Sequence, residues 1–397
     1  MRPKVYQKSE HTISKDHMDP HALSAIETLQ SAGYTAYLVG GGVRDLLLGV
    51  RPKDFDISTS AKPDEIKKLF QRQCLLIGRR FRLAHLRYGN KILEVSTFRS
   101  GDTSSSSLII RDNHWGTEEE DVMRRDFTMN ALFYDPNKEI VLDYVNGVED
   151  ISEKTLKTIG DPHLRFKQDP VRMIRLLKFQ ARFGFHCEEK TLSAMCACKE
   201  EIMKSAPARL LEEMFKMLES GKSEPFFKLL LKHEFLELLL PCFYPFFSGP
   251  TQKRAFHYLH TVDRAMKLGF HVRREVLIAS LIFPIFEQEI MTLMADRHAP
   301  LPMREISHLA KTLLHGIAAS SFVHFPKKLM SYVYFIVINQ FRLTPLKKPP
   351  KLHSRFQSKE DFLLALDMLK IRAEVAPKLK SQLTEWEKVK KTRHKKT

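Results

Sequence analysis

A chain of 397 residues that is 43% hydrophobic is long enough for two or three domains with buried cores, and its five cysteines form no even disulfide framework, so a small disulfide scaffold is excluded. Its 64 Lys and Arg against 47 Asp and Glu give a formal net charge of +17, which favours a polyanionic partner such as nucleic acid. The first residues contain no apolar signal segment and charges interrupt the apolar stretches, so we expect a cytoplasmic protein with no membrane contact.

The first 150 or so residues alternate helical and strand patterns. Asp19 can cap an opening helix, Pro20 suits its first turn and Gly33 ends it. The patterns that follow predict a strand at 35–39, a short helix at 43–48, a strand at 54–58, a helix at 63–70 and strands at 74–77, 81–88 and 91–98. These elements indicate an α/β head with a mixed sheet of about five strands.

Nearly everything after Asp169 has helical spacing, which predicts an all-helical neck and body. Apolar residues at core spacing predict packing helices at 209–218 and 226–240. We expect a mobile Ser-rich loop at 100–107, a hinge at 347–351 and a disordered basic tail at 388–397. The expected parts are a catalytic head at 1–160, a neck for base recognition at 161–220, an RNA-binding body at 221–346 and a C-terminal helical segment with the tail at 347–397.

Two aspartates, Asp54 and Asp56, lie two residues apart on a predicted strand, so both side chains point to one face and Phe55 points into the core. Two carboxylates on one face repel each other unless a divalent cation lies between them, and Mg²⁺ shared with substrate phosphates suits such a pair. Two ions of this kind can support an in-line displacement at an α-phosphate. An Asp-x-Asp alone is weak evidence, because surface turns often carry one. Glu94 on a later strand stays unassigned.

A glycine triplet at Gly40–Gly42 precedes the aspartates by about a dozen residues. It exposes backbone N–H groups at a helix N-terminus, as triphosphate binding requires, and Arg44 can add a charge-assisted contact. The alternative interpretations are an ordinary flexible turn and an intrahelical ion pair between Arg44 and Asp45. Each alternative explains one part of the pattern but not the combination.

Four sequence blocks in this order resemble the class II nucleotidyltransferases, the family of bacterial poly(A) polymerases and CCA-adding enzymes. The blocks are Leu38 to Asp45, Lys53 to Ile57, Arg124 to Leu132 and Asp169 to Arg175. Two further stretches, His11 to Ser14 and Leu76 to His85, are similar to the polymerase branch. One departure is Gln168, which stands where an acid commonly precedes the Asp-Pro pair.

The resemblance implies roles for individual residues. Asp54 and Asp56 are expected to bind the catalytic metals and Asp126 to be a third active-site acid. The residues expected to bind the nucleotide are Gly40, Gly41, Arg44, Arg124, Arg125, Asp169, Arg172 and Arg175.

The spacing of Asp169, Arg172 and Arg175 predicts that they share one face of a helix that can contact a base. A carboxylate accepts from the adenine amine while a guanidinium donates to the adjacent ring nitrogen. Cytosine presents the same order, whereas guanine and uracil reverse it, so the pattern predicts A or C; the alternative is a solvated helix with a surface ion pair. Only the resemblance to the polymerase branch favours ATP alone. Basic residues that can hold RNA phosphates near the site are Arg79, Arg80, Arg82 and Arg87.

The expected activity is template-independent addition of AMP from ATP to RNA 3′-hydroxyls, with Mg²⁺ as cofactor and release of pyrophosphate, as a step that marks RNA for processing or decay. The expected partners are ATP and the 3′ ends of mRNA and other RNAs, and a monomer is expected. Two alternatives remain: a CCA-adding enzyme acting on tRNA, and a non-catalytic RNA-binding protein on the same scaffold.

Overall fold

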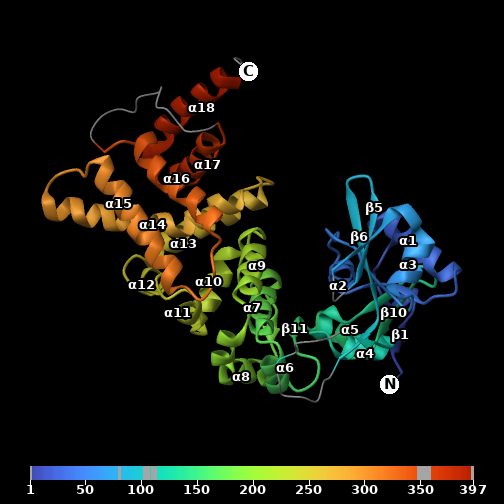
Figure 1. Ribbon diagram of the computed structural model, residues 1–397. Helices are drawn as coiled ribbons and strands as arrows, with labels where there is room; N and C mark the ends of the chain where they lie inside the picture. The colour runs from blue at the N-terminus through green and yellow to red at the C-terminus, as the bar shows by residue number, and fades with distance from the viewer. Residues whose placement is uncertain (1, 79–81, 102–107, 109–113, 347–358, 395–397) are drawn as a thin grey trace. The chain divides into compact units, whose positions relative to one another are not determined.

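The computed structural model describes residues 2–78, 82–101, 108, 114–346 and 359–394 (Figure 1). The chain divides into two compact units, one of residues 1–180 with 184–201 and one of residues 181–183 with 202–397. The first unit contains the sheet, and the second is built from helices. The predicted fold class, an α/β head followed by an all-helical remainder, is therefore confirmed.

The head is built on a mixed sheet of eight strands in the order β1-β10-β9-β2-β3-β6-β5-β4, in which only β3 and β6 run parallel. The strands are β1 Lys4–Tyr6, β2 Ala36–Val39, β3 Asp56–Thr59, β4 Cys74–Ile77, β5 Leu83–Tyr88, β6 Lys91–Thr97, β9 Phe133–Asp135 and β10 Ile140–Asp143. The expectation of about five strands missed β1, β9 and β10 at one end of the sheet. Each of these has three or four residues.

Helices and two short ribbons complete the first unit, and α1, α2 and α3 contact the sheet. The predicted opening helix is confirmed as α1, where Asp19 Oδ1 accepts from His21 N at 2.8 Å and caps the first turn. The helices are α1 Pro20–Ser31, α2 Gly41–Leu47, α3 Pro63–Phe70, α4 Glu118–Met123, α5 Gly147–Ser152, α6 Pro162–Gln168, α7 Val171–Phe183 and α8 Glu189–Ala197. Two small ribbons pair β7 Arg99–Ser100 with β8 His114–Trp115 and β11 Thr155–Leu156 with β12 His186–Cys187.

In the core of the head, side chains from the sheet pack against residues of α4 and of the segment near Ile159. Aromatic rings of Tyr37, Phe98 and Phe133 pack together, with Val122 of α4 and Ile159 buried beside them. This cluster packs β2, which carries part of the first sequence block, and the end of α4, which the block from Arg124 follows directly, against one core.

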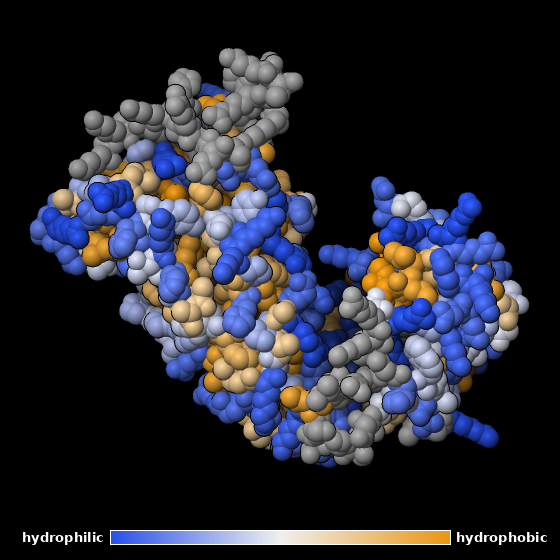
Figure 2. Space-filling view, in the orientation of Figure 1, coloured by the Kyte–Doolittle hydropathy of each residue, from blue (hydrophilic) through white to orange (hydrophobic). Residues whose placement is uncertain are grey.

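Some apolar side chains remain exposed at the other end of the sheet. Leu75 and Ile77 on β4 and Ile92 on β6 are the exposed large apolar residues of these strands. Figure 2 shows apolar surface gathered on one side of the head within a largely hydrophilic face. Exposed apolar groups that gather in this way commonly mark contact surfaces.

The second unit is built from helices, and its interior is strongly apolar. The helices are α9 Pro207–Leu218, α10 Ser223–Lys232, α11 Phe235–Leu239, α12 Tyr244–Ser248, α13 Gln252–Lys267, α14 Arg274–Arg297, α15 Met303–Ser320, α16 Lys327–Leu343, α17 Lys359–Val375 and α18 Lys380–His394. The single helix predicted for 226–240 is wrong: the chain turns at Glu234, whose φ of +63° separates α10 from α11.

Helix α14 is the one helix of the described residues that is long and apolar enough to cross a membrane by length and composition. Most of it is buried, and it contacts α13, α16 and α17. A core helix of a folded unit passes the same test, so this helix is weak evidence for a membrane span.

The C-terminal region differs from the expected disordered tail, because α18 continues to His394. Trp386 anchors it: the indole is fully buried against Phe362 and Leu343, and Nε1 donates to Leu343 O at 2.9 Å. The tail prediction is therefore wrong for 388–394, and 395–397 lie outside the described residues, as do the predicted hinge at 347–351 and most of the Ser-rich loop.

Replacing Trp386 with Ala should lower the free energy of unfolding by about 3–5 kcal/mol, because the substitution leaves a large cavity in the C-terminal core. Urea unfolding followed by circular dichroism measures the change. Trp115, which is 42% exposed, is the matched control, and its replacement should change stability by less than about 0.5 kcal/mol. Equal losses in the two variants would contradict the buried position of Trp386.

Candidate active site

The two aspartates lie beside the glycine turn. Asp56 is the first residue of β3 and pairs in register with Val39, the last residue of β2, directly before Gly40. Asp54 precedes the strand, so the prediction that both lie within it is wrong. Both aspartates are nevertheless exposed while Phe55 between them is buried, as for residues that alternate between two faces.

The charges around Asp56 repel its negative form. Loss of water around the carboxyl is the largest cause of a raised pKa for Asp56, although the residue as a whole is exposed, and the negative charges of Glu94 and Asp54 act in the same direction. Together, and against the lowering effect of Arg125, they raise the pKa to about 6. Glu94 lies on the adjacent strand β6, and its Oε1 is 3.6 Å from Nε2 of His85 on β5. Three carboxylates therefore share one region of the sheet with little positive charge to balance them.

This donor set fits a divalent metal ion. Oxygen ligands suit Mg²⁺, which proteins commonly hold with one or two carboxylates together with substrate phosphates. A bound cation would relieve the repulsion that raises the pKa of Asp56. Among the described residues, no group of three or more His, Cys, Asp or Glu side chains can hold a metal by itself.

The glycine turn is tightly enclosed. Gly40 has φ +65° and ψ −127°, and its N donates to Leu132 O at 3.3 Å. A Cβ on Gly40 would lie 3.2 Å from Arg125 Nη1, and one on Gly42 would lie 3.5 Å from Asp54 O. The turn therefore touches both the chain that carries the aspartates and the arginine pair.

Arg44 is buried rather than extended into solvent. Its Nε and Nη2 donate to Asp45 Oδ1 at 2.9 and 2.6 Å, and its Nη1 donates to Asn130 Oδ1 at 2.5 Å. Its guanidinium also lies 5.4 Å from the ring centroid of Phe179. The structure thus shows the ion pair that was the alternative interpretation of Arg44 and Asp45, and a nucleotide contact of Arg44 stays a prediction.

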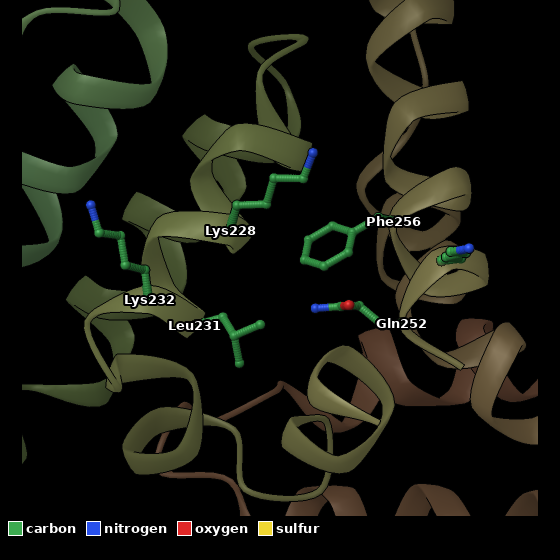
Figure 3. Close-up of a pocket in the computed structure, with 6 residues that line it drawn as sticks. Lys228, Leu231, Lys232, Gln252 and Phe256 are labelled. Carbon is green, nitrogen blue, oxygen red and sulfur yellow. The ribbon is translucent and has the colours of Figure 1, made fainter. Parts of the chain in front are cut away.

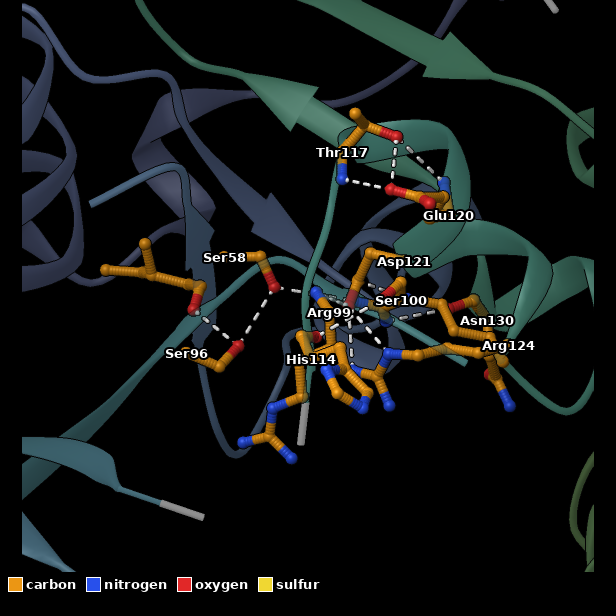
Figure 4. A network of polar contacts seen from close by, with 12 residues as sticks. Ser58, Ser96, Arg99, Ser100, His114, Thr117, Glu120, Asp121, Arg124 and Asn130 are labelled. Atoms are coloured by element: carbon orange, nitrogen blue, oxygen red, sulfur yellow. Dashed lines mark hydrogen bonds and ion pairs between the residues drawn. The ribbon is translucent and has the colours of Figure 1, made fainter. Parts of the chain in front are cut away.

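Asp121 holds the arginine pair that follows it (Figure 4). Its Oδ1 accepts from Nε and Nη2 of Arg124 at 2.9 and 2.7 Å, and its Oδ2 accepts from Nη2 of Arg125 at 2.8 Å. Arg125 also donates to Ser58 Oγ at 3.4 Å and to Asn130 O at 3.2 Å. Burial alone would raise the pKa of Asp121, but the two guanidinium groups hold it below its usual value.

Asp126 connects the head to α7 inside the first unit. Its Oδ1 accepts from Phe127 N at 2.8 Å and from Asn130 Nδ2 at 3.3 Å, while its Oδ2 lies 2.7 Å from Nη2 of Arg175. Burial opposes the charged form, yet Arg175 and the backbone donor hold the pKa of Asp126 below its ordinary value. Asp126 is therefore a buried anion paired with the helix that was expected to contact the base.

The predicted shared helix face of Asp169, Arg172 and Arg175 is wrong, because α7 begins at Val171 and Asp169 has a non-helical backbone with φ −145° and ψ 89°. Arg172 is 5% exposed and donates to Arg165 O and to Arg124 O, each at 3.1 Å. Gln168, at the position where an acid was expected, accepts from Arg165 Nη1 at 3.0 Å.

Three residues of this network were not predicted: Asp121, Asn130 and Arg165. Asp121 lies three and four residues before Arg124 and Arg125, a helical spacing visible in the sequence. Arg165 donates to the backbone oxygens of Arg124 and Arg125 at 2.7 and 2.6 Å, contacts for which no sequence pattern exists.

The basic residues expected to hold RNA near the site are only partly described. Arg79 and Arg80 lie outside the described residues. Arg82 is exposed and contacts Asp64 at 2.9 Å, and Arg87 is exposed on β5. An RNA contact by these side chains stays a prediction.

The sequence is similar to known families and proteins. The family model described as the poly A polymerase head domain matches residues 36–157, and one described as a probable RNA and SrmB-binding site of polymerase A matches residues 184–246. The poly(A) polymerase I of Salmonella typhimurium is 34% identical over 96% of this chain and 84% of its own length.

CCA-adding enzymes are also similar to this chain. The CCA-adding enzyme of Lactobacillus helveticus is 38% identical over 54% of each chain. The crystal structure of the Bacillus stearothermophilus CCA-adding enzyme in complex with CTP has a TM-score of 0.63 at 24% identity and covers 94% of this chain and 82% of that one. At that identity the likeness shows a shared fold.

Replacing Asp121 with Asn should lower the free energy of unfolding by about 3–5 kcal/mol at pH 7, because two guanidinium groups lose a buried anionic partner. The depressed pKa means that the carboxylate contributes fully above the unfolded value of about 3.9 and less as pH falls through the lower folded value. Urea unfolding of wild type and variant from pH 7 downward should therefore give a difference that narrows below about pH 4.

The exposed pair of Asp64 and Arg82 supplies the control for this experiment. Replacing Asp64 with Asn should cost less than about 1 kcal/mol at every pH. A loss for the Asp121 variant that is no larger than the loss for the control would refute a buried anchoring role.

Proposed function

The chain belongs to the nucleotidyltransferase family of bacterial poly(A) polymerase I and the CCA-adding enzymes, and from this premise we propose that it adds AMP from ATP to RNA 3′ ends without a template. The observation that carries the proposal is the pair Asp54 and Asp56 beside the glycine turn, where loss of water and the charges of Glu94 and Asp54 raise the pKa of Asp56. The match to a poly(A) polymerase extends over 96% of the chain, which supports ATP as the nucleotide.

In this proposal Asp54 and Asp56 hold the magnesium ions. When bound, such ions activate the attacking 3′-hydroxyl and neutralise charge on the leaving pyrophosphate. The first turn of α2, which starts at Gly41, offers backbone N–H groups to the triphosphate, since these groups have no partner within a helix. Arg124 and Arg125, held by Asp121, add positive charge beside the same turn.

The proposed base contacts come from Asp169, Arg172 and Arg175. Two backbone oxygens fix the guanidinium of Arg172, and Asp126 fixes that of Arg175, so both groups are oriented before a base arrives. Asp126 acts in this scheme as a positioning acid on Arg175. Selection of adenine over guanine follows from the donor and acceptor order of a carboxylate and a guanidinium.

The same proposal assigns a role to each part of the chain. The head spans 1–160, the neck 161–220, the RNA-binding body 221–346 and the C-terminal segment 347–397, and the enzyme acts as a cytoplasmic monomer on mRNA and other RNAs. The match of residues 184–246 to a probable RNA-binding region supports RNA as the partner of the helical part.

A CCA-adding enzyme is the second candidate. The identity of 38% to the Lactobacillus helveticus enzyme favours it, as does the equal fit of cytosine to a carboxylate and a guanidinium. Both candidates share the proposed metal site, so the choice of nucleotide separates them.

The Asp56→Asn variant should lose AMP incorporation by roughly 10³-fold or more, because one of the two proposed metal ligands is neutralised while the side-chain shape is kept. RNA affinity measured without ATP should stay within about twofold, since the substitution leaves the helical part intact. Incorporation of labelled AMP into an RNA primer is the readout. The exposed Glu27 on α1 gives the control, and a Glu27→Gln variant should behave as wild type. An Asp56 variant that retains wild-type rates would eliminate the metal role.

Supplying one nucleotide at a time tests the choice of substrate. With a generic RNA primer and Mg²⁺, ATP alone should be incorporated repeatedly and CTP alone should not. Incorporation of CTP first on a tRNA that lacks its terminal CCA would identify the second candidate. Failure with both nucleotides, in a preparation that binds RNA, would favour a non-catalytic scaffold.

A further inference from the structure

A basic hollow lies between α10 and α13 of the second unit (Figure 3). It has a volume of about 490 Å³, within the range that proteins use for ligands. The residues that line it are Lys228, Leu231, Lys232, Gln252, Lys253 and Phe256. Three cations thus surround an apolar floor, and the lining contains no acid.

The positive charge of this hollow is largely uncompensated. Lys228 Nζ is 2.7 Å from Glu224 Oε1 and 5.4 Å from the ring centroid of Phe256. Lys232 and Lys253 are exposed, and within the described part of the chain neither lies within 4.0 Å of a carboxylate oxygen. At least two ammonium groups here can therefore accept an anion without breaking an ion pair.

A second hollow, of about 700 Å³, adjoins the first because Lys253 lines both. Its cations include Arg254 and Lys378, and His257 and apolar side chains such as Met291 and Phe341 complete the wall. The one acid in its lining is Glu287, which contacts both Arg254 and Arg372. The surplus of positive charge thus continues across the first turns of α13.

The sequence of α13 keeps its exposed face basic. Its exposed charged and histidine side chains recur at helical spacing on one face. They are Lys253, His257, His260, Arg264 and Lys267. Glu224 contacts His260 and Glu374 contacts Arg264, whereas Lys253 beside the two hollows has no carboxylate oxygen within 4.0 Å among the described residues. Helix α13 lies outside residues 184–246, the segment matched by the RNA-binding family model.

We propose that single-stranded RNA lies across the N-terminal half of α13, with its phosphates on Lys228, Lys232 and Lys253. This inference rests on the proposed function for the identity of the polyanion. Surfaces that bind single strands combine a basic groove with apolar side chains against which sugars and bases rest, and the two adjoining hollows supply both. An acidic peptide could also pair with the lysines, but it has no bases to pack against the apolar side chains of the two hollows, so we expect it to bind more weakly than RNA.

The test compares two triple variants that remove the same charge. In the first, Lys228, Lys232 and Lys253 become Gln; in the matched control, the exposed lysines Lys311, Lys327 and Lys328 on α15 and α16 become Gln. Affinity for a fluorescent single-stranded RNA is measured without ATP at several salt concentrations. Circular dichroism checks that both variants are folded.

The first variant should bind RNA roughly tenfold to a hundredfold more weakly at 0.1 M salt, and the slope of log affinity against log salt should fall by roughly 2, because each lost phosphate contact removes about 0.7 from the slope for single strands. The control should keep the wild-type slope. Equal affinity and slope in the first variant and wild type would overturn the proposal, as would equal losses in both variants. Competition by polyglutamate as strong as by RNA would assign the surface to an acidic protein partner instead and would also overturn it.

This outcome is independent of the proposed activity. If wild type binds RNA through these lysines but incorporates neither nucleotide, the proposed function fails and the RNA surface stands. If wild type incorporates AMP while the lysine variant binds as wild type does, the surface is wrong and the proposed function stands.

Discussion

Asp121 is buried between two guanidinium groups, and the arrangement of the active-site face depends on that carboxylate. It places Arg125 where its guanidinium reaches Ser58 on β3 and the backbone beside the glycine turn. From there the charge of Arg125 lowers the pKa of Asp56, against the effects of burial and of two neighbouring carboxylates. Without this anchor a flexible arginine would lie close to three carboxylates and could neutralise them in place of a metal ion.

Partners also fix the positions of two further arginines, Arg165 of α6 and Arg175 of α7. Asp126 fixes Arg175, and the backbone oxygens of Arg124 and Arg125 fix Arg165. Each of these arginines thus has a defined partner, so its orientation is set before any substrate binds. Buried charges are costly unless paired, and here the pairing fixes the start of α7 against the segment that carries the arginine pair. Because buried charged groups need partners, the pairs that satisfy them also fix the arginines of the site in place.

The sequence predicted those elements whose boundaries carry strong local signals. Pro63 and the apolar spacing after it predicted α3 with its bounds, and Asp19 predicted the cap of α1. The helix predicted through Asp169 was wrong for a reason visible in the sequence: Pro170 follows, and the residue before a proline is disfavoured in helical geometry. The break at Glu234 has no such signal, because a left-handed residue that is not glycine cannot be recognised by type. At the site, sequence blocks predicted which residues lie near one another, but the backbone contacts of Arg165 and Arg172 depend on tertiary packing.

In the proposed function Arg172 contacts the base, and its fixed position would then bear on the choice between one nucleotide and two. Adenine and cytosine offer the same donor and acceptor order, so hydrogen bonding alone accepts both, but the two rings differ in size and place those groups at different distances from the sugar. A site that accepts both bases has to let its guanidinium move between two positions. Arg172 is 5% exposed and held by two backbone oxygens from separate segments, which makes such a movement costly. Under the proposed base contact, rigidity at this residue would favour a site for a single base, and the nucleotide-choice experiment tests that consequence.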